Sequence, residues 1–293
     1  MRANSMCISC LVSKQEKMIR EYSDENKKSE YMNRVLEILC KHGQVESAPW
    51  LAEQINELCY EFWGDLEDYS LVKYQYNRLL LEQEKDIVQQ VGQAGDCIKE
   101  CIKYVCAANY IDFSAVENVN EQTCTQLLEK ARVAAIDEDE YRKFKIDLES
   151  AKKLVYLTDN CGEIVLDKIF IRFIKELHPE LQISVIVRGK NVINDATMED
   201  AKEVGLTEHV PCLGNGNGAP GSVVKRFSQE AKKLFMEADL IIAKGQGNFE
   251  SLFGEGFNPY YLFLCKCELF VRRFGLEKYE SVFVKEERMR WNE

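Results

Sequence analysis

Membrane-spanning segments are absent from this 293-residue sequence, because no apolar run approaches the roughly 20 residues that a spanning helix needs. Residues 1–17 also lack the long apolar stretch of a secretory signal peptide. Basic residues are scarce relative to acidic ones: 38 Lys and Arg face 49 Asp and Glu, which gives a formal net charge of -11. This balance argues against a nucleic-acid partner, because phosphate-backbone affinity comes mainly from clustered Lys and Arg. We therefore expect a cytoplasmic protein that binds neither membranes nor nucleic acids.

Two common phosphate-binding signatures are missing as well. The sequence contains no G-x-x-x-x-G-K-[ST] loop, and no G-x-G-x-x-G follows its first expected strand. Its 12 cysteines include one Cys-x-x-Cys pair, Cys7 and Cys10, but no second pair to complete a four-ligand zinc site. Because no export signal is present, free thiols are the default. We predict that Cys7 and Cys10 are reduced thiols near a domain interface, and that catalysis does not need them.

Residues 1–150 show helical patterns and no convincing strand. Apolar residues recur at helical spacing over 14–41, 48–63, 71–91, 97–109, 121–135 and 138–150. Gly43 and Gly64 end the first two of these helices, and Asp96 is placed to cap the fourth. We therefore expect residues 1–150 to form an all-helical domain.

The pattern changes at Lys153, where short apolar runs begin to alternate with helical segments. The expected strands are 154–157, 183–187, 209–213, 240–243, 269–272 and 281–284, and the helices between them are 163–177, 197–204, 222–237 and 258–265. This alternation predicts an α/β domain over residues 151–293, a three-layer α/β/α sandwich with a mostly parallel, Rossmann-like sheet. Right-handed crossovers then place the carboxyl ends of the parallel strands at one edge.

Polar side chains follow the first strand where it ends. Asp159 and Asn160 come directly after the apolar run 154–157, and Gly162 precedes a helical pattern. A carboxylate beside an amide suits a hard divalent cation, which prefers oxygen ligands. Free amides at the start of the following helix suit an anion. A capping box formed by Asn160 and Glu163 explains the same spacing equally well.

The other strand ends add further polar groups. Arg188 and Asp195 follow the second strand, although Thr197 begins a capping-box pattern there too. The segment 214–221 contains four glycines, which either allow close backbone approach to a ligand or form a mobile connection. Lys244 ends the fourth strand and suits an anion, unless it is a solvated surface lysine. Together these groups predict a metal site beside a phosphate site, the combination that phosphoryl transfer needs.

Four motifs in these segments occur in a recognisable order. They are Asp-Asn-x-Gly-Glu-Ile-Val-x-Asp at 159–167, Arg-Gly-x-x-Val-Ile-Asn-Asp-Ala-Thr at 188–197, Ala-Pro-Gly at 219–221 and Lys-Gly-Gln-Gly-Asn-Phe-Glu at 244–250. Together they resemble the damage-control phosphatase family, also known as domain of unknown function 89, and most closely its small microbial branch. The resemblance covers nearly the whole chain and includes the cysteine pair and residues 109–113.

This resemblance implies a helical N-terminal domain packed on an α/β/α sandwich. It also implies a metal-dependent phosphatase acting on small phosphorylated metabolites, such as sugar phosphates or damaged cofactor or nucleotide phosphates. The family's metal ligands correspond to Asp159, Asn160 and Asp195, and its phosphate-contacting lysine corresponds to Lys244. The expected cofactor is one divalent ion: manganese, magnesium, nickel or cobalt.

Roles can be assigned to the remaining polar groups on this basis. The expected catalytic residues are Asp159, Asp195 and Glu163, and the expected phosphate-binding residues are Lys244, Arg188, Gly162 and Asn248. Glu163 or Asp195 would orient an attacking water, and direct attack by Asp159 is the other route open. Residues near 109–113 are expected to help select the substrate.

Two other function classes fit parts of the sequence. The acidic residues after strands and the glycine-rich segment 214–221 suit a nucleoside, as in an S-adenosylmethionine-dependent methyltransferase. A non-catalytic protein that senses a phosphorylated metabolite would bind metal and ligand without turnover. Sensitivity to a chelator separates the phosphatase from the methyltransferase, because a methyl donor needs no divalent metal.

Overall fold

The structure is a computed structural model that describes residues 1–64, 68–109, 129, 131 and 134–290. Its helices are α1 (Ser5–Ile19), α2 (Glu25–His42), α3 (Ala48–Trp63), α4 (Ser70–Gln93), α5 (Cys97–Ala108), α7 (Glu138–Ser150), α8 (Glu163–Leu177), α9 (Met198–Glu203), α10 (Gln229–Met236), α11 (Gly245–Leu252) and α12 (Glu268–Phe274). Its strands are β1 (Lys153–Leu157), β2 (Gln182–Val187), β3 (Cys212–Gly214), β4 (Leu240–Lys244), β5 (Tyr260–Leu264) and β6 (Ser281–Lys285). The predicted helix 121–135 falls almost entirely outside the described residues.

The six strands form one sheet in the order β3-β2-β1-β4-β5-β6. Its first five strands are parallel, and β6 pairs antiparallel with β5 at the edge. This confirms the predicted mostly parallel, Rossmann-like sheet. The chain runs outward from β1 to β3 and then returns to the other side of β1 with β4. The carboxyl ends of β1 and β4 therefore flank the topological switch point, where open α/β sheets bind ligands.

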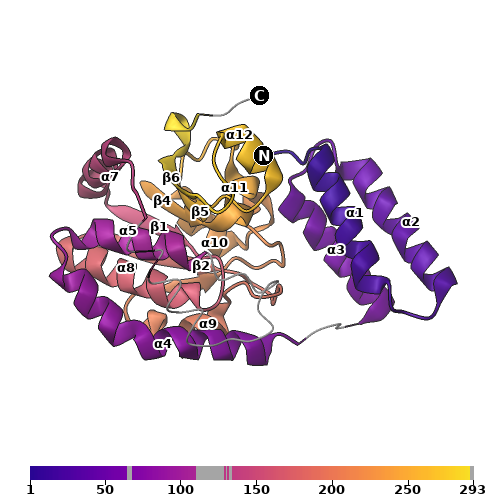
Figure 1. Cartoon of the computed structure of the whole chain (residues 1–293), viewed down its shortest axis with the longest axis horizontal. Coiled ribbons are helices and arrows are strands. Elements are labelled where there is room, and N and C mark those ends of the chain that lie inside the picture. Colours follow the sequence, from indigo (N-terminus) through magenta and orange to yellow (C-terminus); the bar gives the residue numbers. More distant parts are fainter. Residues whose placement is uncertain (65–67, 110–128, 130, 132–133, 291–293) are drawn as a thin grey trace.

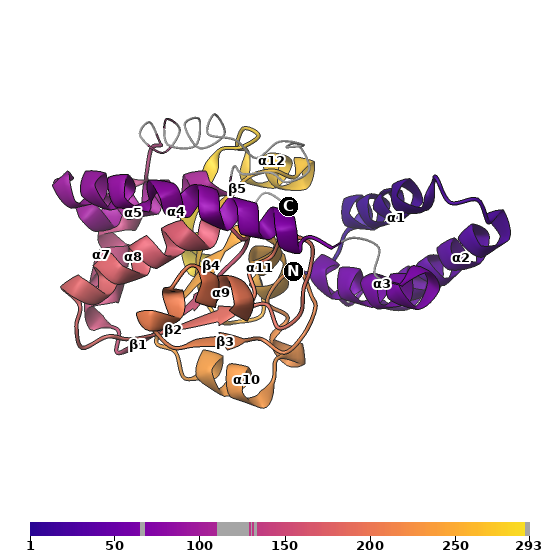
Figure 2. The same ribbon diagram turned by 90° about the horizontal axis from the view of Figure 1, so that it is seen from below.

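Helices cover both faces of the sheet, as predicted (Figures 1 and 2). Side chains alternate along β1, so Leu154 and Tyr156 pack in a core with α4, α5 and α8. Val155 and Leu157 point to the opposite face, where they share a second core with α10, α11 and α12. The sheet is thus the middle layer of an α/β/α sandwich.

The helical half of the chain divides into two parts. Helices α4, α5 and α7 contribute to the core that also contains α8 and the sheet, so this core continues across the domain boundary predicted at residue 150. Helices α1, α2 and α3 have a core of their own around Tyr31, Val35, Leu51 and Ile55. They project from one end of the sandwich (Figure 2).

Helix α4 spans 24 residues, but charged side chains recur along it and its apolar stripe packs against the sandwich. None of the helices within the described ranges has the length and apolar character needed to cross a bilayer.

Five of the predicted segments differ from the structure. The strand predicted over 209–213 is confined to Cys212–Gly214, and the helix predicted over 222–237 is reduced to Gln229–Met236 after a short 3-10 turn. The predicted helix 258–265 is strand β5, and the predicted strand 269–272 lies in helix α12. All five side chains of β5 are buried, and a short, fully apolar run has no periodicity that separates a strand from a helix. The single helix predicted over 14–41 is two helices, because Asp24 caps a new helix by accepting the N–H of Lys27 at 3.0 Å.

Candidate functional site

The turn after β1 carries the first two candidate metal ligands. Asp159 and Asn160 follow the strand, and Gly162 leads the chain into α8 with a φ of +71°. The segment after β2 packs against this turn: Ala196 donates its backbone N–H to the carbonyl of Asp159 at 2.8 Å, and Asp195 forms an isolated antiparallel bridge with Asn160. The structure therefore brings Asp159, Asn160 and Asp195 together at the sheet edge.

Hydrogen bonds leave one oxygen free on each of these three side chains. Asn160 donates from Nδ2 to Asp159 Oδ2 at 3.0 Å and to Glu163 Oε1 at 2.7 Å, and Asp195 Oδ2 accepts the Nε–H of Arg188. Within the described residues, the Oδ1 atoms of Asp159, Asn160 and Asp195 accept no hydrogen bond. No three His, Cys, Asp or Glu side chains in that part of the chain are arranged to hold a metal ion, so a cation here would need the Asn160 amide.

Arg188, at the end of β2, is buried with 2% of its surface exposed. Its Nε contacts Asp195, and its Nη1 donates to Asn248 Oδ1 at 3.0 Å. Its Nη2 lies 3.7 Å from Asp159 Oδ1 and makes no hydrogen bond to the residues that the structure describes. A buried guanidinium with unused N–H groups beside the free carboxylate oxygen is suited to bind a phosphoryl oxygen.

Lys244 ends β4 on the other side of the switch point and is fully buried, which rules out the solvated surface lysine. Its Nζ lies 3.1 Å from Glu163 Oε2 and 3.5 Å from Asp167 Oδ1. Burial alone would lower the pKa of Lys244, but the carboxylates of Asp167, Glu163 and Asp159 outweigh it and raise the pKa above its ordinary value. The ammonium therefore stays charged near neutral pH.

Negative charge exceeds positive charge in this buried cluster. The carboxylates are those of Asp159, Glu163, Asp167 and Asp195, and the cations are those of Arg188 and Lys244. Burial, together with the charges of Glu163 and Asp195, raises the pKa of Asp159 from 3.8 to about 7. Burial also raises the pKa of Asp195. One divalent cation would supply the two missing positive charges, and the free oxygens are ligands that such an ion prefers.

Two predicted phosphate-binding residues have other partners. The N–H of Gly162 donates to Asn77 Oδ1 at 2.7 Å, so this amide at the start of α8 is not free to bind an anion. Asn248 donates to the carbonyls of Thr158 and Lys244, and its Oδ1 accepts from Arg188. The arrangement does not support phosphate contact by Gly162 or Asn248. Asn248 instead joins the ends of β1 and β4 and holds the guanidinium of Arg188.

The glycine-rich segment 214–221 is packed against other backbone segments. Asn215 Oδ1 accepts the N–H groups of Gly189 and Asn217, at 2.8 and 3.0 Å. A Cβ placed on Gly221 would lie 2.4 Å from the carbonyl oxygen of Gly247. The glycines therefore allow close approach between parts of this chain, which explains their number without a ligand.

The structure places two further residues in the cluster: Asn109, which was expected to lie near the substrate, and Asp167, for which no role was predicted. The rest of the segment expected to help select the substrate, residues 110–113, lies outside the described residues. Asn109 donates to Asp159 and Glu163 from the end of α5. Asp167 is fully buried between Lys244 and Tyr156, whose hydroxyl donates to Asp167 Oδ1 at 2.6 Å. The sequence contains an indication that Asp167 belongs to the cluster, because Asp167 lies one turn after Glu163 on the otherwise apolar face of α8.

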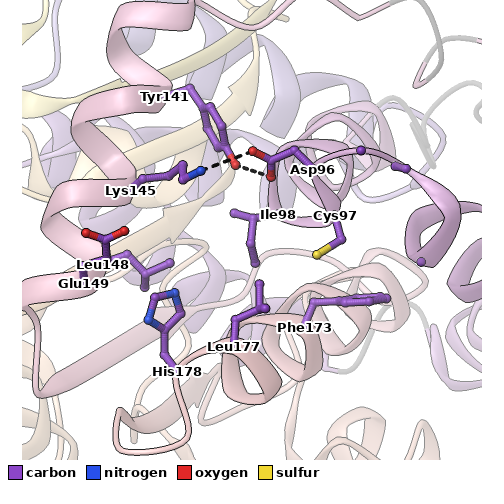
Figure 3. Close-up of a pocket in the computed structure, with 13 residues that line it drawn as sticks. Asp96, Cys97, Ile98, Tyr141, Lys145, Leu148, Glu149, Phe173, Leu177 and His178 are labelled. Carbon is purple, nitrogen blue, oxygen red and sulfur yellow. Dashed lines mark hydrogen bonds and ion pairs between the residues drawn. The ribbon is translucent and has the colours of Figure 1, made fainter.

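A cavity of about 350 Å³ lies apart from this cluster (Figure 3). Asp96, Tyr141 and Lys145 form one side of it and contact one another, and Leu177 and His178 line the opposite side. Helix α8 begins at the carboxylate cluster and ends at Leu177, so the cavity lies at the far end of that helix. It is therefore not part of the candidate site.

Comparison with known proteins places the chain in a family. A family profile described as "Damage-control phosphatase ARMT1-like domain" matches residues 3–282. The chain belongs to this family. A protein of Archaeoglobus fulgidus named damage-control phosphatase is 31% identical over 288 residues, which are 94% of this chain and 96% of that one. A damage-control phosphatase of Pyrococcus horikoshii is 27% identical over 95% of this chain and 96% of its own length. The resemblance deduced from the motifs is thus confirmed.

A solved structure agrees with the fold. The crystal structure of a DUF89 family protein from Pyrococcus horikoshii superposes with a TM-score of 0.83 and covers 98% of this chain and 99% of its own. At 24% sequence identity it supports the architecture alone.

Proposed function

We propose that this protein is a metal-dependent phosphatase that hydrolyses small phosphorylated metabolites. One observation carries the proposal: three free ligand oxygens, a buried arginine with unused N–H groups and a buried lysine meet at the switch point of the sheet. A phosphate ester needs such a set of groups, because its hydrolysis develops charge on several oxygens at once. Membership of the family and the names of the relatives agree with it.

The free oxygens of Asp159, Asn160 and Asp195 would hold one divalent cation, which when bound would neutralise charge on the phosphoryl group and acidify a water. Arg188 Nη2 would bind a phosphoryl oxygen beside Asp159 Oδ1. Lys244 would supply a second, fixed positive charge.

Glu163 is less suited to orient the attacking water than the sequence suggested. Its Oε1 accepts two amide N–H groups and its Oε2 pairs with Lys244, so both oxygens are engaged. We assign Glu163 to holding Lys244 in place. The water is instead assigned to Asp195, because a carboxylate oxygen has two lone pairs: Oδ1 would hold the cation with one and accept a hydrogen bond from the water with the other. In the alternative route, Asp159 Oδ1 would attack phosphorus and would no longer serve as a ligand of the cation.

The test is a screen for phosphate release from sugar phosphates, nucleotides and cofactor phosphates, repeated with manganese, magnesium, nickel and cobalt. We expect turnover that EDTA abolishes and that the metal restores. Asp195→Ala should lower turnover at least about 100-fold, whereas Asp139→Ala, at an exposed position on α7, should leave it unchanged. Absence of phosphate release under every condition would refute the proposal, and binding without turnover would favour a metabolite sensor.

A further inference from the structure

Asn109 connects the helical part of the chain to the carboxylate cluster. It follows α5 directly as its C-cap and is 1% exposed. Its Oδ1 accepts the backbone N–H of Leu264, at the end of β5, at 3.2 Å. That N–H can only donate, so it fixes which end of the amide is oxygen and turns Nδ2 toward the cluster.

The Nδ2 group of Asn109 bridges two carboxylates. It donates to Asp159 Oδ2 at 2.8 Å and to Glu163 Oε1 at 2.9 Å. Asn160 Nδ2 donates to the same two oxygens, at 3.0 and 2.7 Å. Each amide therefore gives one N–H to each carboxylate, which offsets the repulsion between two buried anions.

The hydrogen bonds from the two amides also determine which oxygen of each carboxylate remains available to other partners. Because Asp159 Oδ2 is held by two amides, its Oδ1 is the atom that faces Arg188 and is available to a cation. Because Glu163 Oε1 is held in the same way, its Oε2 is the atom that contacts Lys244. One amide on α5 thus orients both a candidate metal ligand and the partner of the lysine.

We propose that Asn109 is a positioning residue for the phosphatase site: its amide aims Asp159 Oδ1 at the metal and Glu163 Oε2 at Lys244. This inference rests on the proposed function. Groups of this kind, which contact ligands and not the metal, typically contribute 10–100-fold to metal affinity or activity. Because Asn109 caps the end of α5, the geometry of the site depends on how α5 packs against α8.

Two substitutions separate positioning from a purely structural role. Asn109→Ala removes both the N–H donors and the acceptor for Leu264. Asn109→Asp keeps the size and the acceptor oxygen for Leu264 but has no N–H to donate in its ionised form. It also adds a carboxyl group beside Asp159 and Glu163, so Asn109→Ala carries the distinction: if Asn109 only anchored the end of α5 to β5, Asn109→Ala would lose stability but keep the Mn²⁺ affinity of the wild type.

The experiment measures Mn²⁺ binding to the metal-free proteins by calorimetry, and the hydrolysis of p-nitrophenyl phosphate at saturating Mn²⁺. We expect Asn109→Ala to raise the Kd for Mn²⁺ about 10–100-fold. Both variants should lower kcat at least about tenfold and change KM less than about threefold, because the lost bonds orient groups that act in the transition state.

Wild-type kcat in Asn109→Asp, or wild-type Mn²⁺ affinity in Asn109→Ala, would overturn the inference and leave the phosphatase proposal intact. A wild-type protein that neither binds Mn²⁺ nor releases phosphate from any substrate would overturn the phosphatase proposal, and this inference with it.

Discussion

At the scale of single residues, the candidate site is a set of buried charges that hold one another in place. The residues of the candidate metal and phosphate sites could be predicted from the sequence, because Asp159, Asn160 and Lys244 stand at strand ends and Asp195 lies in the segment that follows β2. Their partners could not, since the bond between Asn109 and Glu163 joins residues 54 positions apart. The same limit explains why Gly162 and Asn248 looked free in the sequence.

Asp167 allows a prediction about pH. Burial raises its pKa from 3.8 to about 6, despite the opposing effects of Lys244 and the hydrogen bond from Tyr156. The folded protein therefore binds this proton more tightly than the unfolded chain does. The stability that Asp167 contributes is fully present below about pH 4 and is lost as the pH rises through about 6, a change on the order of 3 kcal/mol.

Asp167→Asn should remove this dependence and keep an acceptor for the Tyr156 hydroxyl. The measurement is urea unfolding of the metal-free wild type and variant between pH 4.5 and 8. We expect the wild type to lose stability relative to the variant as the pH rises. A difference between the two proteins that stays constant over this range would contradict the pKa of Asp167.

At the scale of elements, the alternation of strands and helices after residue 153 was predictable, and helix α8 was predicted with the bounds that it has. The segment 258–272 was not, because its helix and strand were assigned in reverse. Strand β5 is buried on both faces between β4 and β6, so neighbours distant in sequence impose its conformation.

Helix α11 begins against a candidate metal ligand, and this gives a prediction with a matched control. Gly245 has a φ of +79°, and a Cβ placed on it would lie 2.0 Å from Asp159 Oδ2. Gly254 has a similar φ of +81°, but nothing lies within 4 Å of its Cβ position. Alanine at either site costs about 1 kcal/mol of backbone strain. Only Gly245→Ala should also displace Asp159 and lower turnover and Mn²⁺ affinity at least about tenfold. Equal turnover in the two variants would be inconsistent with this packing.

At the scale of the whole molecule, helices α1, α2 and α3 form a unit with a core of its own beside the sandwich (Figure 1), and several polar contacts join the two. Glu53 on α3, which is 1% exposed, accepts the N–H of Gly218 at 2.9 Å and lies 2.7 Å from Arg226 Nε. The N-terminal amine of Met1 donates to the carbonyl of Glu250 on α11 at 2.8 Å. Cys7 and Cys10 are both free thiols, as predicted: Cys7 is buried in the core that contains α12, whereas Cys10 is exposed. That catalysis needs neither of them stays a prediction.

Glu53 and Glu57 offer a paired test of this contact, because both lie on α3 and both contact Arg226. Glu53→Ala leaves the half-buried N–H of Gly218 and the guanidinium of Arg226 without the Glu53 carboxylate, which should lower the free energy of unfolding by about 1–2 kcal/mol. Glu57 is half-exposed and 3.5 Å from Arg226, so Glu57→Ala should cost less than about 0.5 kcal/mol. Urea unfolding gives both values, and amide exchange at Gly218 should be faster in Glu53→Ala only. Equal losses would mean that Glu53 does not anchor α3.

The metal site can be located by anomalous diffraction from a crystal of the protein soaked in Mn²⁺ at a concentration that saturates turnover. We expect one strong peak bounded by Asp159 Oδ1, Asn160 Oδ1 and Asp195 Oδ1, within bonding distance of each. A peak at another place in the molecule, or no peak under conditions in which the enzyme is active, would contradict the assignment of this cluster as the metal site.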